Sequence, residues 1–393
     1  MEEEVGVEDM AQRGNGQRGP PDGRQAPCQR CDRKLNATWL TCGGVTLRRM
    51  TSVLVTGAAG FIGAHAAAAL ASAGHRVVGC DSFNSYYDPR LKHARVQALL
   101  TPLGVEVAAL DLSDVAATQA FWARHRCEVV LHLAAQAGVR HSVQRPLEYA
   151  TANLVGFASV LEACRLNGVR HLLHASSSSV YGQRADAPFR EQDSTDAPAS
   201  FYAATKKANE LMAHATAAVH GLPATSLRFF TVYGPWGRPD MAYWGFAEAI
   251  QAGRPITLYG HGLLQRDFTC IDDVVDALLR LVRRGPPAPD AEGVPCEVLN
   301  LGHRQPVRVV DFVAQLEAAL GRRAVVAFAP RPVGDVPLTC ADPSRLEAAI
   351  GPWAATPLAE GLPRFVQWLR GWKGWGEDPA RVPAAASVQL DPA

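Results

Sequence analysis

A glycine-rich turn between a β-branched run and an Ala-rich run is the feature that most constrains the fold. Val53–Thr56 has the composition of a buried strand, and residues from about 64 to 73 have that of a helix. Gly57, Gly60 and Gly63 stand between them. The first glycine permits a tight turn, the second lets backbone approach a pyrophosphate, and the third lets the helix pack closely on the sheet. The segment therefore predicts the first βα unit of a dinucleotide-binding parallel sheet.

Short β-branched runs and longer helical runs alternate after this turn. Such alternation is typical of βαβ units, whose strands form a parallel sheet. The predicted strands are Arg76–Cys80, Glu106–Leu110, Glu128–Leu133, His171–Ser176, Ala224–Phe229, Ile256–Tyr259 and Glu297–Leu301, and the predicted helices cover about 147–166, 201–219, 243–252 and 272–284. The pattern is looser after residue 229. We therefore predict an α/β fold, a Rossmann-type doubly wound parallel sheet with a smaller α+β C-terminal substrate lobe.

Charge and hydropathy exclude several classes of protein. The 39 basic and 38 acidic residues give a formal net charge of +1, so no overall field favours nucleic acid or an anionic membrane. No apolar stretch reaches the roughly 18 residues of a membrane span, and the acidic start is unlike a secretory signal. Scattered cysteines suit a reducing compartment, and the pair Cys28 and Cys31 lacks a second pair at zinc spacing. We expect a cytoplasmic protein with no metal site and neither nucleic-acid nor membrane partners.

Asp81 favours NAD over NADP as the cofactor. It ends the second predicted strand, about 20 residues after the glycine turn, where a carboxylate accepts hydrogen bonds from the adenosine ribose. The same charge would repel the 2′-phosphate of NADP. Asp111 follows the third strand and Leu133–Gln136 ends the fourth, so both are candidates for further cofactor contacts, although each alone also fits an ordinary strand end.

A serine run and a Tyr-x-x-x-Lys spacing predict a proton-transfer site. Ser177 lies in the run 176–179 after the fifth strand, and Tyr202 and Lys206 lie one turn apart on the next helix. A phenol with a pKa near 10 is a poor base at neutral pH, but the Lys206 ammonium and a positive nicotinamide favour the phenolate. Tyr202 is then able to take a hydroxyl proton while hydride leaves the same carbon, and Ser177 shares that proton.

With these residues the chain resembles the extended short-chain dehydrogenase/reductase family, and more narrowly its UDP-glucuronate 4-epimerases. The resemblance covers roughly residues 52–372. The matching strings, besides the serine run, are DSFNSYYDPRLK (81–92), AAQAGVR (134–140), NLVG (153–156), FTVYGPWGRPDMA (230–242) and RDF (266–268). The Phe-Asn-x-Tyr-Tyr-Asp and Gly-Arg-Pro-Asp-Met strings narrow the subfamily most.

The resemblance implies an activity with no net redox change. It implies that Tyr202 deprotonates the C4 hydroxyl, that hydride passes to tightly bound NAD, and that the 4-keto sugar rotates before hydride returns to its other face. UDP-glucuronate and UDP-galacturonate would interconvert in this way. Because the intermediate of a uronate is a β-keto acid, the carboxylate must be held in a geometry that resists loss of carbon dioxide.

The resemblance also implies the site residues. Ser178, Ser179, Thr231 and Arg238 match the positions that grip the carboxylate, for which a guanidinium with neighbouring hydroxyls is apt. Arg266 resembles a diphosphate ligand, and Asp335 resembles an acid that binds the uridine ribose or anchors a loop. The expected catalytic residues are Tyr202, Lys206 and Ser177. The expected cofactor-binding residues are Gly57, Gly60, Phe61, Ile62, Gly63, Asp81, Asn84, Asp111, Leu112, Ala134, Ala135, Gln136, Asn153, Tyr202 and Lys206.

Four alternatives compete with this prediction. A dehydratase typically carries Asp-Glu where this chain has Ser178 and Ser179, which cannot act as an acid/base pair for elimination. A UDP-glucuronate decarboxylase differs only in how the carboxylate is held, so it stays open. A UDP-glucose/UDP-galactose 4-epimerase is disfavoured by Arg238 near Thr231. An NAD-sensing binding protein commonly lacks the Tyr-Lys pair.

Four segments and a homodimer are expected. The segments are 1–49, disordered or foreign to a native protein that starts at Met50; 50–228 with about 272–303, the NAD-binding domain; about 229–271 with 304–372, the nucleotide-sugar-binding lobe; and 373–393, a disordered tail. Relatives usually pair two long helices across a dimer interface, and residues 147–166 and 201–219 are the corresponding helices here.

Overall fold

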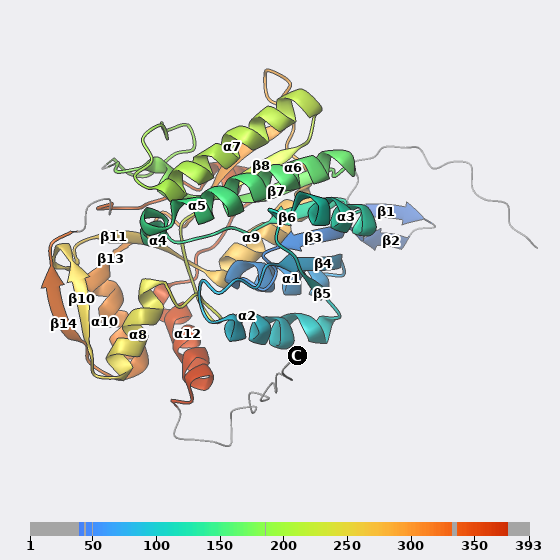
Figure 1. Cartoon of the computed structure of the whole chain (residues 1–393). Helices are drawn as coiled ribbons and strands as arrows, with labels where there is room; N and C mark the ends of the chain where they lie inside the picture. Colours follow the sequence, from blue (N-terminus) through green and yellow to red (C-terminus); the bar gives the residue numbers. More distant parts are fainter. Residues whose placement is uncertain (1–38, 43–44, 49, 185, 332–335, 376–393) are drawn as a thin grey trace, which may run out of the picture. The chain divides into compact units, whose positions relative to one another are not determined.

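Seven parallel strands form the central sheet of the protein. The computed structural model describes residues 39–42, 45–48, 50–184, 186–331 and 336–375. In spatial order the strands are β12 (Cys296–Leu301), β8 (Ala224–Phe229), β7 (His171–Ser177), β6 (Val129–His132), β3 (Ser52–Thr56), β4 (Arg76–Asp81) and β5 (Glu106–Ala109). Every neighbouring pair is parallel. The predicted Rossmann-type sheet is confirmed, and helices cover both of its faces (Figure 1).

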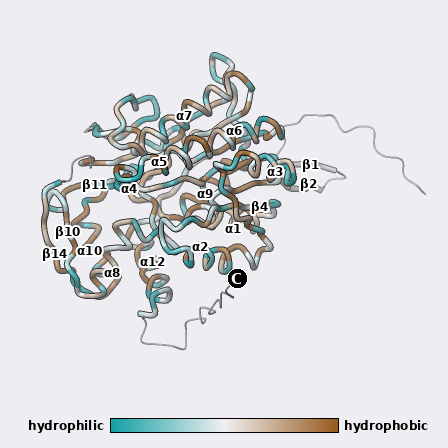
Figure 2. Tube along the Cα trace, viewed as in Figure 1, coloured by the Kyte–Doolittle hydropathy of each residue, from teal (hydrophilic) through white to brown (hydrophobic). Residues whose placement is uncertain are grey.

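Alternate strand residues pack against two different helix layers. On β3, Val53 and Val55 belong to one buried cluster and Leu54 belongs to the other, because successive strand side chains point to opposite faces. The first cluster includes α1 (Phe61–Ser72) and α9 (Ile271–Arg284), and the second includes α3 (Val115–His125), α6 (Gly156–Leu166) and α7 (Phe201–His220). Figure 2 shows hydrophobic stretches recurring along these strands and helices. Burial on both faces explains the nearly continuous apolar strands.

Smaller sheets and several helices make up the rest of the C-terminal part. The three-stranded sheet has β9 (Thr231–Tyr233) parallel and β13 (Pro306–Arg308) antiparallel to β11 (Gln265–Cys270), and β10 (Pro255–Tyr259) pairs with β14 (Val325–Ala329). The helices are α8 (Ala242–Gln251), α10 (Val309–Leu320), α11 (Ser344–Ile350) and α12 (Leu358–Lys373), with one short turn, η5 (Gly260–Gly262). The chain from Arg48 onward clusters as one unit, and its division into domain and lobe stays a prediction.

A separate small unit precedes this one. Strands β1 (Trp39–Cys42) and β2 (Val45–Arg48) pair with each other in a sheet of their own. The expectation that residues 1–49 are disordered or foreign to the native protein stays a prediction. Cys28 and Cys31 lie outside the described residues, as does most of the expected tail.

Some elements differ from the prediction or were missed. The expected helix at 147–166 is three consecutive pieces, α5 (Pro146–Tyr149), the π-helical turn η3 (Ala150–Val155) and α6. Side-chain bonds explain the break, because Tyr149 and Asn153 both bond the loop at 136–138. The elements that the sequence pattern did not predict include α2 (Pro89–Arg95), η1 (Val96–Leu100), η2 (Thr101–Leu103), α4 (Val139–Gln144) and the turn η4 (Ser178–Tyr181).

A buried ion pair ties the end of the sheet to α7. Arg228 on β8 donates from Nε and Nη2 to the two carboxylate oxygens of Glu210 on α7, each over 2.8 Å. The Ser176 hydroxyl donates to the same carboxylate, and all three side chains are buried. The pair therefore fixes the position of α7 relative to the carboxyl end of β7.

We predict that Arg228→Met destabilises the protein by about 3–5 kcal/mol, because it leaves the Glu210 carboxylate buried without its counter-charge. The measurement is the free energy of unfolding from denaturant titration. The matched control is Arg165→Met, which breaks the exposed pair between Arg165 and Glu162 on α6 and should hardly move the unfolding midpoint. Equal effects of the two substitutions would contradict a structural role for the buried pair.

Candidate active site

One large cavity, of about 1190 Å³, lies along the carboxyl ends of the sheet strands and reaches the smaller sheets. This is the edge at which parallel α/β sheets bind ligands. The cavity is lined by all the predicted site residues that the structure describes, with the exception of Asn153. Asp335 lies outside the described residues. Residues far apart in the sequence, such as Gly57, Tyr202 and Arg238, are thus brought to one space.

The glycine turn has the close approaches that its three glycines predict. Gly57 has a φ of +68°, and a Cβ there would stand 2.8 Å from the backbone nitrogen of Ala134. A Cβ on Gly63 would stand 2.0 Å from the carbonyl oxygen of Gly57. Helix α1 begins directly after Gly60 without a side-chain cap on its N-terminal N–H groups. The cradle therefore fits the pyrophosphate of a dinucleotide, whose negative charge suits a helix N-terminus.

Asp81 is held in place beside this turn. Its buried carboxylate accepts hydrogen bonds from the backbone nitrogens of Ala59 (3.2 Å) and Phe83 (2.8 Å) and from Lys92 Nζ (3.0 Å). A carboxylate has roughly four acceptor positions, so it retains capacity for a ribose hydroxyl. Lys92 also donates to Asn84 Oδ1 over 3.2 Å. Sequence reasoning missed the role of Lys92, although it lies in one of the matching strings.

Asp111 lines the cavity, whereas Asn153 lies behind its wall. Asp111 is exposed at the cavity wall, where it accepts hydrogen bonds from Ser113, and Leu112 beside it is buried. Asn153 is buried and bonds both the backbone nitrogen (2.8 Å) and the carbonyl (3.0 Å) of Gln136. Asn153 therefore supports the cavity wall through the Gln136 backbone, and its expected role in cofactor binding stays a prediction.

The predicted proton-transfer residues meet at the carboxyl end of β7. Ser200 caps α7, whose first two turns carry Tyr202 and Lys206, and Ser177 ends β7. Tyr202 forms a hydrogen bond with Ser177. Burial raises the pKa of Tyr202, while the nearby Arg238 charge and the Ser177 bond act in the opposite direction. The Arg238 charge thus acts together with the Ser177 bond in favouring the phenolate, and the role expected of Lys206 stays a prediction.

Lys206 is buried and anchored to the strand. Its ammonium donates to the carbonyl oxygen of Ala175 over 2.9 Å, and burial lowers its pKa to about 8. An ammonium has three donors, so two remain for other acceptors in the cavity. The side chain is therefore placed to bind hydroxyls of a ligand near Tyr202.

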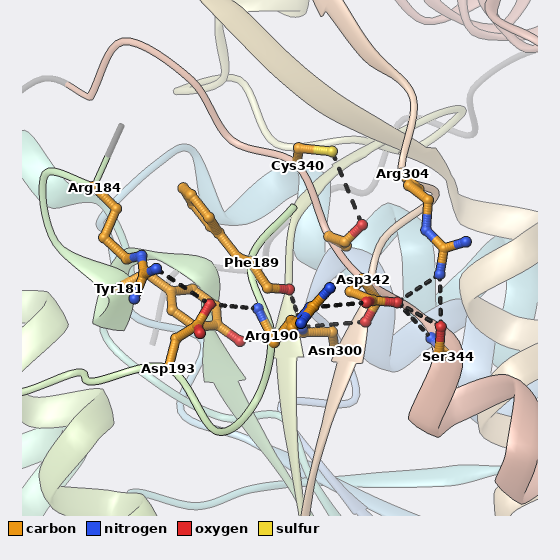
Figure 3. A network of polar contacts seen from close by, with 11 residues as sticks. Tyr181, Arg184, Phe189, Arg190, Asp193, Asn300, Arg304, Cys340, Asp342 and Ser344 are labelled. Carbon is orange, nitrogen blue, oxygen red and sulfur yellow. Dashed lines mark hydrogen bonds and ion pairs between the residues drawn. The ribbon is translucent and has the colours of Figure 1, made fainter. Parts of the chain in front are cut away.

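The turn η4 presents Ser178 and Ser179 to the cavity. The Ser177 hydroxyl accepts bonds from the Ser179 nitrogen (3.2 Å) and hydroxyl (2.9 Å). At the other end of the turn, Tyr181 donates to Oδ1 of the buried Asn300 over 2.7 Å. Figure 3 shows Asn300 between Tyr181, Phe189 and Asp342, so one buried amide connects the serine turn to two distant segments.

The cavity lining also includes Thr231, Arg238 and Arg266. Thr231 begins β9 and is paired in register with Phe268 of β11, the strand that also carries Arg266. The Arg238 guanidinium forms a side-on pair with Asp240, a residue of the same loop. Tyr86 in turn donates to Asp240 over 3.1 Å. Neither Asp240 nor Tyr86 was assigned a role from the sequence.

Arg95 is a buried cation that joins the two halves of the cavity wall. From α2 it donates to the carbonyls of Ala59 (3.2 Å), Trp236 (2.9 Å) and Gly237 (2.7 Å), and to the Tyr87 hydroxyl (2.7 Å). It thus connects the glycine turn with the loop that precedes Arg238. No motif pointed to this residue, because its partners lie far away in the sequence.

Comparison with known proteins agrees with this geometry. The model of the NAD dependent epimerase/dehydratase family matches residues 53–302. UDP-glucuronate 4-epimerase 3 of Arabidopsis thaliana is 45% identical over 344 residues, which are 85% of this chain and 80% of that protein.

Two solved structures have similar folds. UDP-glucuronic acid 4-epimerase from Bacillus cereus, in complex with UDP-glucuronic acid and NAD, is 31% identical with a TM-score of 0.74, over 82% of this chain and 99% of that one. UDP-glucose 4-epimerase from Thermotoga maritima, with UDP-glucose, is 29% identical with a TM-score of 0.72, over 83% and 100%. The backbone alone therefore does not distinguish an acidic from a neutral sugar.

We predict that Gly63→Ala yields protein with little or no bound NAD, because the new Cβ would push the backbone of the glycine turn out of position. The measurement is the amount of dinucleotide released from the purified protein on denaturation. Gly371→Ala is the matched control, since this helical glycine in α12 has nothing within 4 Å of its Cβ position. Full NAD content in Gly63→Ala would show that the close packing is dispensable.

Proposed function

The chain belongs to the NAD dependent epimerase/dehydratase family, and from this premise we propose that it interconverts UDP-glucuronate and UDP-galacturonate by inverting C4. The single observation that carries the proposal is that one cavity is lined by Tyr202, by its hydrogen-bond partner Ser177 and by Arg238, whose charge acts on Tyr202. The bond to Ser177 suits proton transfer, and the positive charge suits an acidic sugar. The named relatives support the same activity.

The proton chemistry is assigned to three side chains. Tyr202 takes the proton of the C4 hydroxyl, and Ser177, which is bonded to it, shares that proton. NAD, when bound, would supply a reversible hydride acceptor. Lys206 holds hydroxyl groups near Tyr202 with the two donors that its bond to Ala175 leaves. The residues that hold NAD are those of the glycine turn, Asp81 and the wall from Ala134 to Gln136.

The carboxylate of the sugar is assigned to Ser178, Ser179, Thr231 and Arg238. Their hydroxyls and guanidinium line the sugar end of the cavity, where a 4-keto uronate would need a fixed carboxylate to avoid losing carbon dioxide. Arg266 is assigned to the diphosphate, because it also lines the cavity and carries a positive charge. Asp335 keeps its expected role, either at the uridine ribose or as the anchor of a loop.

The direct test is incubation of the purified protein with UDP-glucuronate and no added cofactor, with products separated by chromatography. Formation of UDP-galacturonate supports the proposal, and the reverse reaction should give the same mixture. UDP-xylose or a 4-keto pentose would indicate decarboxylation. Turnover of UDP-glucose without turnover of UDP-glucuronate would show that the sugar is misassigned.

We further infer a homodimer in the cytoplasm. Several large apolar side chains on α5, η3 and α7 are exposed in the single chain, among them Leu147 (79% exposed), Val155 (47%), Leu211 (57%) and Val219 (74%). These elements include the two helices expected at the interface, and their burial against a second copy would remove apolar surface from water. The cysteines from Cys80 to Cys340 are free thiols, as in a reducing compartment. Within the described residues, no helix is both long and apolar enough to cross a membrane.

We predict that Tyr202→Phe lowers kcat for UDP-glucuronate by about 10²–10⁴-fold, because the ring remains while the proton acceptor is lost. The variant should retain NAD and bind UDP as the unmodified protein does, which separates a chemical defect from misfolding. Turnover is measured from the initial rate of UDP-galacturonate formation. A loss of less than about threefold would mean that another group takes the proton.

We predict that Leu147→Glu combined with Leu211→Glu converts the dimer into monomers, because two charges per chain would have to be buried at the interface. Light scattering coupled to size exclusion gives the mass. Leu263→Glu, at a residue 58% exposed directly after the short turn η5, is the control and should leave the mass unchanged. A dimer that survives the double substitution would place the interface elsewhere.

A further inference from the structure

We propose that Asp240 is a specificity-determining residue, an internal carboxylate that occupies one edge of Arg238 and thereby limits how strongly the site binds the carboxylate of a sugar. The inference rests on the proposed function, because it concerns the same sugar end of the cavity. Asp240 would repel the carboxylate of the sugar, whereas Ser178, Ser179, Thr231 and Arg238 would attract it. Its basis is the ion pair that Arg238 already forms with Asp240.

The pair between Arg238 and Asp240 uses a defined part of the guanidinium. Nε donates to Asp240 Oδ1 over 3.0 Å, and Nη2 donates to Oδ2. An arginine has five N–H donors, so three remain, two of them on Nη1. This arrangement leaves one edge of the guanidinium for a ligand and commits the other to the protein. The two side chains are about equally accessible, at 24% and 25%, and both line the cavity.

Tyr86 fixes Asp240 in this position. The phenol donates to Asp240 Oδ2 over 3.1 Å, across 154 positions of sequence. Its ring is confined by Gly138, where a Cβ would stand 2.3 Å from the Tyr86 hydroxyl, and by the ring of His141 at 5.0 Å between centroids. Burial, together with the charge of Asp240, raises the pKa of Tyr86, so it remains a neutral donor. Asp240 is thus part of a constrained wall.

The acids that line the cavity show why the pair between Arg238 and Asp240 matters for binding an acidic sugar. Among the described residues that line the cavity, the acids are Asp81, Asp111 and Asp240. Asp81 ends β4, Asp111 follows β5, and both stand at the dinucleotide end, whereas Asp240 stands beside Arg238 and acts electrostatically on Tyr202. Its charge offsets that of Arg238 and repels a second carboxylate brought to the free edge. Recognition of a uronate then depends strongly on the hydroxyls of Ser178, Ser179 and Thr231.

The two most diagnostic strings of the sequence meet at this point. Tyr86 belongs to the Phe-Asn-x-Tyr-Tyr-Asp string and Asp240 to the Gly-Arg-Pro-Asp-Met string. The glycine turn is assigned to cofactor binding, and the Tyr-Lys pair is assigned to proton transfer. The contact between Tyr86 and Asp240 has neither role, and its position beside Arg238 points to recognition of the sugar.

The test compares binding of an acidic and a neutral sugar nucleotide in the absence of turnover. UDP-glucuronate and UDP-glucose are titrated by calorimetry into NAD-loaded protein that carries Tyr202→Phe, with and without Asp240→Asn. We expect Asp240→Asn to increase the ratio of the two affinities in favour of UDP-glucuronate by about tenfold, because Arg238 is left without its internal counter-charge. UDP-glucose binding should change by less than about twofold, because it has no carboxylate to respond.

Two further variants separate charge from structure. Asp272→Asn makes the same chemical change at an exposed acid outside the cavity lining, and should leave the ratio unchanged. Tyr86→Phe removes a hydrogen bond to Asp240 but keeps its charge, so the ratio should change much less than in Asp240→Asn. NAD content and the unfolding midpoint show whether each variant is folded.

An unchanged or lower ratio in folded Asp240→Asn would overturn the proposal, since it would mean that Asp240 only orients Arg238. This outcome is distinct from failure of the proposed function. That failure would appear as the absence of UDP-galacturonate in the unmodified protein, whatever the binding ratio of the variants.

Discussion

The packing of α1 on the glycine turn is the constraint on which the rest of the structure depends. Because Gly63 has no Cβ, the start of α1 lies against the Gly57 carbonyl, and the helix N-terminus faces the cavity. In the same turn, the backbone nitrogen of Ala59 donates a hydrogen bond to Asp81, and the carbonyl of Ala59 accepts one from Arg95. A bulkier turn would displace both Asp81 and, through Arg95, the loop that leads to Arg238.

Buried charges organise the other side of the cavity. Glu210, the acid of the pair with Arg228, lies one helical turn after Lys206 on α7. It also accepts a hydrogen bond from Ser176, the residue before Ser177. Such a pair contributes little net stability compared with apolar packing, but its loss is costly and it tolerates few alternative arrangements. Here it sets the strand end and the helix in the register that brings Tyr202 to Ser177. The proposed proton-transfer residues are therefore positioned by an ion pair whose two side chains lie outside the cavity lining.

The sequence predicted the sheet, the glycine turn and the Ser, Tyr and Lys set, because each depends on local spacing. Strand ends were accurate to within a residue or two, since both faces are buried and the apolar runs are sharp. The string that carries Asn153 did not show that its side chain bonds the Gln136 backbone, and its expected part in cofactor binding stays a prediction. Lys92, Arg95 and Asp240 were missed for another reason. Their importance comes from partners brought close by folding, and no periodicity or spacing reports a contact such as that between Tyr86 and Asp240.

The central claim is that the hydrogen on C4 of the sugar leaves as hydride and returns to the same carbon without exchange with solvent. Its most direct measurement uses UDP-glucuronate that carries deuterium at C4, incubated in ordinary water with purified protein and no added cofactor. The account predicts UDP-galacturonate that retains the deuterium at C4. Product in which the deuterium is replaced by solvent hydrogen, or a pentose formed with release of carbon dioxide, would contradict it.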